Sequence, residues 1–222
     1  MSQKVLVAED FDSINIAVAK TLEELGMANF DHAKYCDDAF LKIRKALHDN
    51  EPYDLLITDL SFPDDGRRNK ITSGEVLIAE VRKVQPDIKI IVFSVEDKPF
   101  RIKSLFDTYD ISGYVFKGRN SIPQLKQAIP NILEKDEIYL SPELSHIRND
   151  KTVSEIDHYD ISLLKLLAQG LKQNEISEKF KESGITPNST SAVEKRINRL
   201  KIHFMANNNV QIVVMAKDLG FI

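Results

Sequence analysis

The sequence predicts an α/β fold for the first 133 residues, followed by a small all-α domain. Strand-like and helix-like patterns alternate along residues 1–133, which indicates a parallel sheet with helices on both faces. Three of the predicted strands are short, continuous apolar runs, as expected for strands that are covered on both sides. Residues 157–222 contain only helical patterns, and a chain of 222 residues is long enough for two unequal domains.

Each predicted strand is followed by a predicted helix, which gives five βα units. The helices have apolar residues at helical spacing and end near recognisable breakers, such as Gly26 and Pro86. Pro123 is tolerated because it lies in the first turn of the fifth helix. The strands are expected at 4–10, 29–35, 53–59, 89–94 and 113–117, and the helices at 14–26, 37–49, 74–84, 100–110 and 121–135.

Composition and charge exclude several classes of protein. No apolar stretch approaches the roughly 20 residues that cross a bilayer, and the chain starts with a strand pattern instead of a signal peptide. Cys36 is the only cysteine, so an internal disulfide is impossible. The net charge is −5 for residues 1–149 and +1 for residues 150–222, so charge alone does not predict nucleic-acid binding by the second half. We therefore expect a cytoplasmic protein without a membrane partner.

Charged and hydroxyl side chains occur where the predicted strands end. The first strand ends in Glu9 and Asp10, the third in Asp59, the fourth in Ser94 and the fifth in Lys117. A parallel sheet brings these ends to one edge, where three carboxylates repel one another unless a cation joins them. Oxygen ligands that leave room for water and phosphate suit Mg²⁺. Each residue alone would more often be a turn, a cap or a solvated charge, but together they predict a phosphoryl-acceptor site with Asp59 as the nucleophile.

Residues 1–133 resemble the receiver domain of response regulators in two-component signalling. The resemblance covers the acidic pair Glu9-Asp10, Asp59 with Pro63 four residues later, Ser94 and Lys117. It implies a flavodoxin-like five-strand order and phosphoryl transfer from the phosphohistidine of a sensor histidine kinase to Asp59. It also implies that Tyr114, three residues before Lys117, is the switch aromatic that turns inward when the Ser94 hydroxyl moves toward the phosphoryl group.

A hydrolase of the haloacid-dehalogenase type is the main alternative for an aspartyl-phosphate site. That chemistry needs a second acid two residues after the nucleophile, and Ser61 occupies this position, so we do not expect an enzyme. The loop at 64–73 is longer than receivers usually have before the following glycine, here Gly74. We expect a tolerated surface insertion; the alternative is that Arg67, Arg68 or Lys70 contacts the phosphoryl group or the kinase.

Residues 134–156 are polar and charged, which predicts a linker with an ordered anchor at Tyr139-Leu140. In the domain expected at 157–222, the third helix (191–204) has a core stripe, and its basic residues fall on other faces. A short helix of this kind after a turn is what a recognition helix for DNA requires. The stripe consists of Val193, Ile197, Leu200 and Phe204, and the residues expected to bind DNA are Lys195, Arg196, Arg199 and Lys201.

Residues 157–222 resemble the four-helix helix-turn-helix domain of LuxR/NarL-type regulators, and "IYLSPEL" resembles the linker of that family. The resemblance implies a response regulator of the NarL/FixJ type that binds promoter DNA and forms a homodimer on activation. Glu194 departs from the family because it stands where a lysine usually faces DNA; its spacing from Ser191 also fits a capping box. The alternative is therefore a phosphorylation-dependent regulator whose second domain binds protein.

Overall fold

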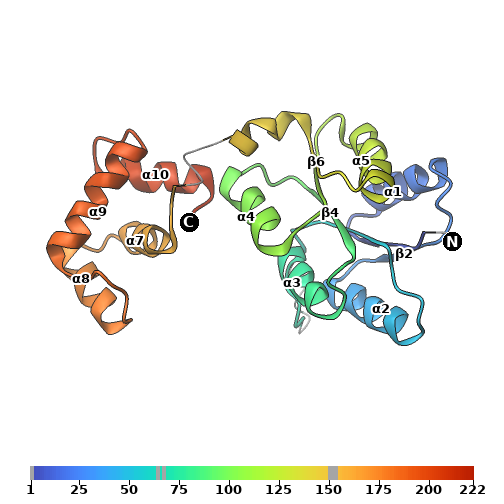
Figure 1. Ribbon diagram of the computed structural model, residues 1–222, viewed down its shortest axis with the longest axis horizontal. Coiled ribbons are helices and arrows are strands. Elements are labelled where there is room, and N and C mark those ends of the chain that lie inside the picture. The colour runs from blue at the N-terminus through green and yellow to red at the C-terminus, as the bar shows by residue number, and fades with distance from the viewer. Residues whose placement is uncertain (1–2, 64–65, 67–68, 150–154) are drawn as a thin grey trace. The chain divides into compact units, whose positions relative to one another are not determined.

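The computed structural model describes residues 3–63, 66, 69–149 and 155–222, so Arg67 and Arg68 lie outside the described residues (Figure 1). The chain divides into two compact units. The first comprises Met1–Asp97 and Ile102–Ser145, and the second comprises Lys98–Arg101 and His146–Ile222. None of the described helices is long and apolar enough to cross a membrane.

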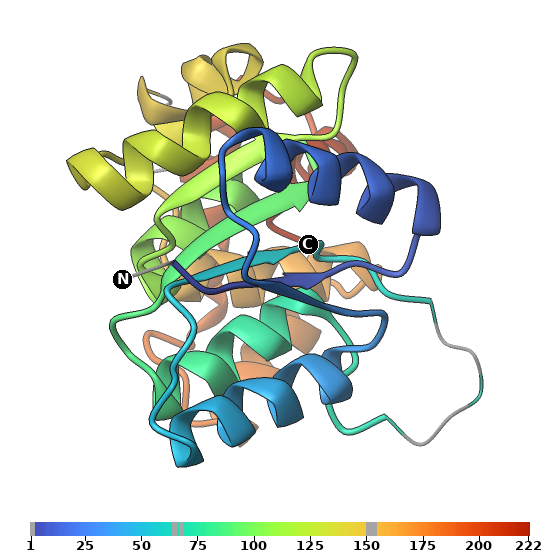
Figure 2. The same cartoon turned by 90° about the vertical axis from the view of Figure 1, so that its right-hand side faces the viewer.

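The first unit is a parallel sheet with helices on both sides, which confirms the predicted fold class. The strands occur in the order β2-β1-β3-β4-β5-β6, and every neighbouring pair is parallel. Helices α1 and α5 cover one face, and α2 and α3 lie on the other (Figure 2). The strands are β1 Val5–Ala8, β2 Phe30–Ala33, β3 Leu55–Thr58, β4 Lys89–Ser94, β5 Gly113–Phe116 and β6 Tyr139–Leu140, and the helices are α1 Asp12–Glu24, α2 Cys36–His48, α3 Gly74–Val84, α4 Pro99–Tyr109 and α5 Ser121–Lys135.

The strand register brings the predicted site residues to one edge of the sheet. Ala8 pairs with Thr58, and Thr58 pairs with Val92, so the residues that follow β1 and β3 lie side by side. Ser94 pairs with Phe116, which directly precedes Lys117. The carboxyl ends of the central strands therefore form a common rim, which is where ligands bind in sheets of this type.

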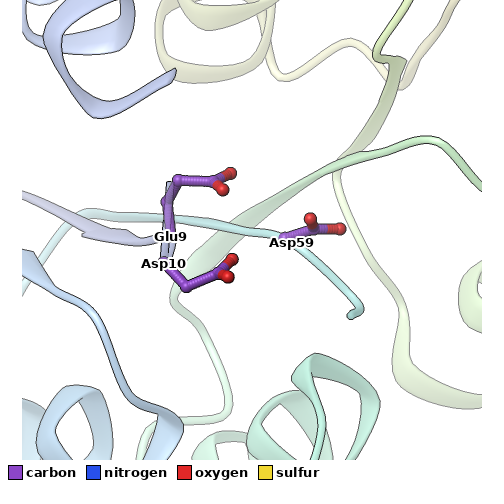
Figure 3. Close-up of side chains that lie close together, drawn as sticks. All are labelled: Glu9, Asp10 and Asp59. Atoms are coloured by element: carbon purple, nitrogen blue, oxygen red, sulfur yellow. The ribbon is translucent and has the colours of Figure 1, made fainter. Parts of the chain in front are cut away.

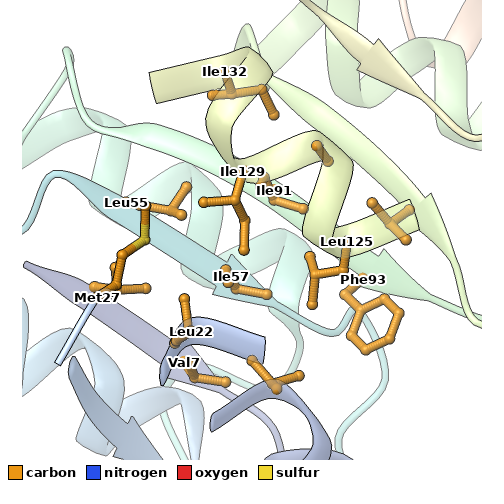
Figure 4. Close-up of a cluster of buried hydrophobic side chains, with 14 residues drawn as sticks. Val7, Leu22, Met27, Leu55, Ile57, Ile91, Phe93, Leu125, Ile129 and Ile132 are labelled. Carbon is orange, nitrogen blue, oxygen red and sulfur yellow. The ribbon is translucent and has the colours of Figure 1, made fainter. Parts of the chain in front are cut away.

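Alternate residues of the central strands face α1 and α5 and form a hydrophobic core (Figure 4). Strand side chains at every second position pack there against one stripe from each of the two helices. The buried cluster contains Val5, Val7, Leu55, Ile57, Ile91, Phe93 and Val115 from the strands and Val18, Leu22, Leu125, Ala128, Ile129 and Ile132 from the helices, together with Met27.

The sixth strand is a difference from the five strands that we expected. Tyr139 pairs with Gly113 and Leu140 pairs with Tyr114, so the segment predicted as a linker anchor is part of the sheet. A two-residue strand carries too little periodicity to be recognised from sequence. Helix α5 continues to Lys135, and the 3₁₀ helix η1 (Pro142–Asn149) follows the strand. The domain boundaries at 133 and 157 stay a prediction.

Within residues 155–222, the second unit has four α-helices with a core of their own: α7 His158–Ala168, α8 Gln173–Glu182, α9 Thr190–His203 and α10 Asn209–Leu219. The core stripe predicted for the third helix is buried at all four positions: Val193, Ile197, Leu200 and Phe204. Its helix begins at Thr190, because the side chain of Ser189 accepts a hydrogen bond from the backbone N–H of Ala192.

Candidate functional site: an acidic pocket and a basic helix

Three carboxylates meet at the carboxyl edge of the sheet. Glu9 and Asp10 follow β1, Asp59 follows β3, and one oxygen from each lies within 4.8 Å of the others (Figure 3). Glu9 is 2% exposed and Asp59 is 5% exposed, so water screens their repulsion poorly. The sequence-based prediction of this cluster depended on parallel strands, and the structure brings all three residues together.

Lys117 joins two of the three carboxylates, Glu9 and Asp59. Its Nζ donates hydrogen bonds to Glu9 Oε2 and Asp59 Oδ2, at 2.6 Å each. The lysine side chain is only 9% exposed, which makes these two bonds charge-assisted contacts in a poorly solvated site. One ammonium group cannot balance three carboxylates, so the site retains an excess of negative charge.

Electrostatics and unpaired oxygen atoms both favour a cation in this cluster. Burial raises the pKa of Glu9 above its ordinary value, although Lys117 opposes that shift. Asp10 Oδ1 is buried and has no hydrogen-bond partner among the described residues. A buried oxygen without a donor is costly unless a ligand satisfies it. Three carboxylates close together, one of them with an unpaired oxygen, fit the preference of Mg²⁺ for oxygen ligands.

The Asp59 carboxylate is held from two directions. Oδ1 accepts hydrogen bonds from the backbone N–H groups of Leu60, at 2.6 Å, and Ser61, at 3.3 Å, while Oδ2 accepts from Lys117. The peptide N–H of Asp59 donates to the Ala8 carbonyl at 3.1 Å, so β1 fixes the backbone at this point. The carboxylate is therefore preorganised with nitrogen donors around it.

Ser94 is the last residue of β4, as the sequence predicted, and Tyr114 lies within the neighbouring strand β5. Both are fully buried, and Tyr114 Oη donates to the Glu96 carbonyl at 2.7 Å. Ser94 Oγ has no hydrogen-bond partner in the part of the chain that the structure describes. A buried hydroxyl without a partner is available to donate to an incoming oxyanion.

Lys70, in the long loop before α3, points to solvent and is tied to α2 instead of to the acidic cluster. Lys70 is exposed, and its backbone N–H donates to Asp37 Oδ2 at 2.9 Å, which ties the loop to the start of α2. Gly74, which follows the loop, packs directly on the acceptor residue. A Cβ atom at Gly74 would lie 1.8 Å from the Asp59 carbonyl oxygen. Close backbone approach explains the glycine at this position.

Gly74→Ala should therefore disturb the acceptor residue from outside the site. The methyl group must push Asp59 away from α3, and overpacking of this kind costs about 1–3 kcal/mol of stability. We expect phosphorylation by acetyl phosphate, followed by intact mass, to slow more than tenfold. Val76→Ala in the same helix is the matched control, because Val76 is exposed. Equal rates for the two variants would show that Gly74 does not position Asp59.

Helix α9 carries the basic residues that the sequence assigned to DNA binding, and three of them are accessible. Lys195 is exposed, Arg199 has a side chain that is 51% exposed, and Lys201 is partly exposed. Lys195 and Arg199 line an open pocket of about 390 Å³ together with Tyr159 and Pro187. This pocket gives the second unit a basic surface beside the helix.

Arg196, which is also predicted to bind DNA, is paired with two carboxylates of α7 and its N-cap. Its Nε donates to Asp160 Oδ1 at 2.5 Å and its Nη2 donates to Asp160 Oδ2 at 3.0 Å and to Asp157. The guanidinium also lies 5.3 Å from the centre of the Tyr159 ring. Asp160 is completely buried, so Arg196 supplies the positive charge that this carboxylate requires. We assign Arg196 to holding α9 against α7.

Sequence reasoning missed Asp157 and Asp160, although a signal was present. The two acids have the spacing of a capping box, and in the structure each side chain accepts from the other's backbone N–H at the start of α7. The capping interpretation of Glu194 fails, because the N-cap of α9 is Ser189 and Glu194 is an exposed residue within the helix.

Comparison with known proteins gives similarity in fold at low sequence identity. No protein-family model matches the chain. The Fimbriae Z protein of Escherichia coli (strain K12) is 24% identical over 135 residues, which cover 58% of this chain and 60% of that protein. The chain thus matches about three fifths of the length of this curated relative.

Several solved structures that resemble the chain are of RcsB. One structure of the Salmonella typhimurium RcsB response regulator has a TM-score of 0.72 at 21% identity, over 97% of this chain and 99% of that one. The chain therefore shares the fold of that solved structure. An RcsB–DNA complex has a TM-score of 0.65 at 20% identity over 99% and 100% of the two chains. RcsB from Salmonella enterica serovar Typhimurium, bound to promoter rprA with phosphomimetic BeF3−, has a TM-score of 0.64 at 21% identity over 98% and 99%.

Proposed function

We propose that this protein is a cytoplasmic, phosphorylation-activated transcription regulator that accepts a phosphoryl group on Asp59 from a sensor histidine kinase. The observation that carries the proposal is the contact of Lys117 Nζ with both Asp59 and Glu9 at 2.6 Å, beside a third carboxylate. A nucleophile flanked by a fixed cation and by spare oxygen ligands is the arrangement that phosphoryl transfer to a carboxylate requires.

The roles of the remaining site residues follow from their places around Asp59. Glu9, Asp10 and Asp59 would hold Mg²⁺, with one backbone carbonyl just beyond Asp59 as a further ligand. When bound, Mg²⁺ neutralises charge on the phosphoryl oxygens. Lys117 stays beside the acceptor and binds one phosphoryl oxygen, and Ser94 donates its buried hydroxyl to another. Tyr114 is the switch residue, and its position changes when Ser94 moves. A receiver with two states needs a side chain that packs differently in each of them.

The second unit would bind promoter DNA through α9. Lys195, Arg199 and Lys201 are the candidate contacts, since they are accessible and Arg196 is occupied by Asp160. A homodimer on activation is supported by exposed apolar residues on one side of α10, where Val210 is 73% and Val214 is 50% exposed. The match to RcsB bound to DNA adds support at the level of fold.

A DNA titration across a salt series tests the second half of the proposal. Arg199→Ala should weaken operator binding by phosphorylated protein more than tenfold, because Arg or Lys at a guanine edge contributes roughly 1–3 kcal/mol. Glu194→Lys should tighten binding and raise the log–log salt slope by about 0.9, the value for one further phosphate contact. Glu178→Lys, at an exposed position of α8, changes the net charge equally and is the control.

A flat slope for Glu194→Lys would place residue 194 away from DNA. If Arg199→Ala also binds DNA normally, α9 is not the reading helix. A role in binding protein is then favoured, and one observation supports it as the second candidate function. Ile202 and Met205, at the end of α9, are 81% and 89% exposed, and large apolar side chains at such exposure are typical of protein contacts.

A further inference from the structure

We propose that Ser141 is a positioning residue for the phosphorylation of Asp59. Its hydroxyl holds β5 immediately before Lys117, and it thereby couples phosphorylation to the docking of residues 139–145 on the edge of the sheet. The inference rests on the proposed function, because it assigns a control point to the same acceptor site.

Residues 139–141 take the place of a full neighbouring strand along the outer edge of β5. Strand β6 supplies only two residue pairs, and the backbone N–H of Ser141 then donates to the Tyr114 carbonyl at 3.0 Å. The chain next turns into η1, which leaves the N–H of Phe116 without a strand carbonyl opposite it. Ser141 Oγ accepts from this N–H at 2.9 Å, so one hydroxyl completes the hydrogen bonding of β5 at its carboxyl end.

The hydroxyl of Ser141 also joins this strand to α5. Oγ donates to Gln124 Oε1 at 2.5 Å, and Gln124 Nε2 donates to the Glu143 carboxylate at 2.8 and 2.9 Å. Ser141 is completely buried and Gln124 is 7% exposed. A serine can accept and donate at once, whereas alanine would leave the Phe116 N–H and the Gln124 oxygen buried without partners.

Close packing of this segment on β5 is visible at Gly113 as well. A Cβ atom there would lie 2.6 Å from Ile132 Cδ1 and 3.4 Å from Tyr139 Cβ, so glycine allows β6 and α5 to approach the strand. Leu144, in the first turns of η1, is buried. Apolar contacts therefore hold residues 139–145 against β5, and the Ser141 hydroxyl fixes the position of the carboxyl end of that strand.

Phe116 directly precedes Lys117, so the position of the Phe116 backbone determines where the Lys117 side chain starts. The N–H of Lys117 donates to the Ser94 carbonyl at 2.8 Å, and its Nζ reaches Glu9 and Asp59 at 2.6 Å each. A misplacement of about 1 Å in such a group can cost on the order of 100-fold in rate. By linkage, any state of Asp59 that moves Lys117 must also change the stability with which residues 139–145 dock.

Amide hydrogen exchange followed by NMR tests the positioning step without any phosphodonor. Exchange at Phe116 and Lys117 should be more than tenfold faster in Ser141→Ala than in the wild type. Ser141→Thr retains the hydroxyl and should restore slow exchange, and Ser145→Ala, at an exposed serine of the same segment, should have no effect. Unchanged exchange in folded Ser141→Ala would overturn the positioning role.

Phosphorylation by acetyl phosphate with Mg²⁺ tests the coupling. Ser141→Ala should accept phosphate at least fivefold more slowly than the wild type and Ser145→Ala. In the wild type, beryllofluoride should change the exchange of amides 139–145 at least twofold, a result that needs no variant to fold. No change there, or a normal rate in Ser141→Ala, would overturn the coupling. A wild type that accepts no phosphate would instead refute the proposed function, and the donor-free exchange would still decide the role of Ser141.

Discussion

Asp59→Asn should abolish phosphorylation of the protein. The reason is chemical, because an amide oxygen cannot act as the nucleophile that forms an acyl phosphate. The fold should survive, since the backbone donors to Oδ1 and the contact between Lys117 and Glu9 do not require a charge on residue 59. Incubation with Mg²⁺ and acetyl phosphate, followed by intact mass, should show one phosphoryl group on the wild type and none on the variant.

Asp107→Asn is the matched control, because it makes the same substitution at an exposed site on α4. Asp10→Ala should also prevent labelling at low Mg²⁺, since it removes one of three oxygen ligands and leaves Asp59 intact. Phosphate uptake by Asp59→Asn equal to that of the wild type would refute the acceptor assignment. Unchanged labelling of Asp10→Ala would contradict the metal site.

Arg196→Met should strongly destabilise the second unit. It removes the cation that hydrogen-bonds the buried Asp160 and leaves only Arg199, at 3.9 Å from that carboxylate. Breaking a buried ion pair in this way costs about 3–5 kcal/mol. Hydrogen exchange and mass spectrometry of the full chain in rising urea would measure the loss in peptides of α7 and α9. DNA binding should be lost along with this stability.

Lys195→Met is the control for this prediction, because Lys195 is the exposed neighbour on the same helix. Its stability should stay within about 0.5 kcal/mol of the wild type, although it should bind DNA less tightly. If the two variants unfold at the same urea concentration, Arg196 does not hold α9 against α7. Arg196 would then again be a candidate for DNA binding.

The acidic site was predictable because it depends on local sequence and on one general rule of topology. An apolar run that ends in a carboxylate identifies a strand end, and parallel strands place their carboxyl ends on one rim. Glu9, Asp10, Asp59 and Lys117 are close together for that reason, and no side-chain packing had to be known. The buried core stripe of α9 was predictable in the same way, because helical periodicity alone assigns its face.

The pairing of side chains from distant segments was not predictable. Arg196 is one of several basic residues with the same spacing on α9, and only the position of α7 places Asp160 beside it. Ser141 lies in a polar segment without periodicity, and its role depends on the open edge of β5. The sequence by itself determined the five βα units and the rim on which the carboxylates lie, because periodicity and strand direction are local properties. Only the tertiary structure decided which basic residue of α9 pairs with a buried carboxylate and which stay accessible, because that pairing depends on how the helices pack.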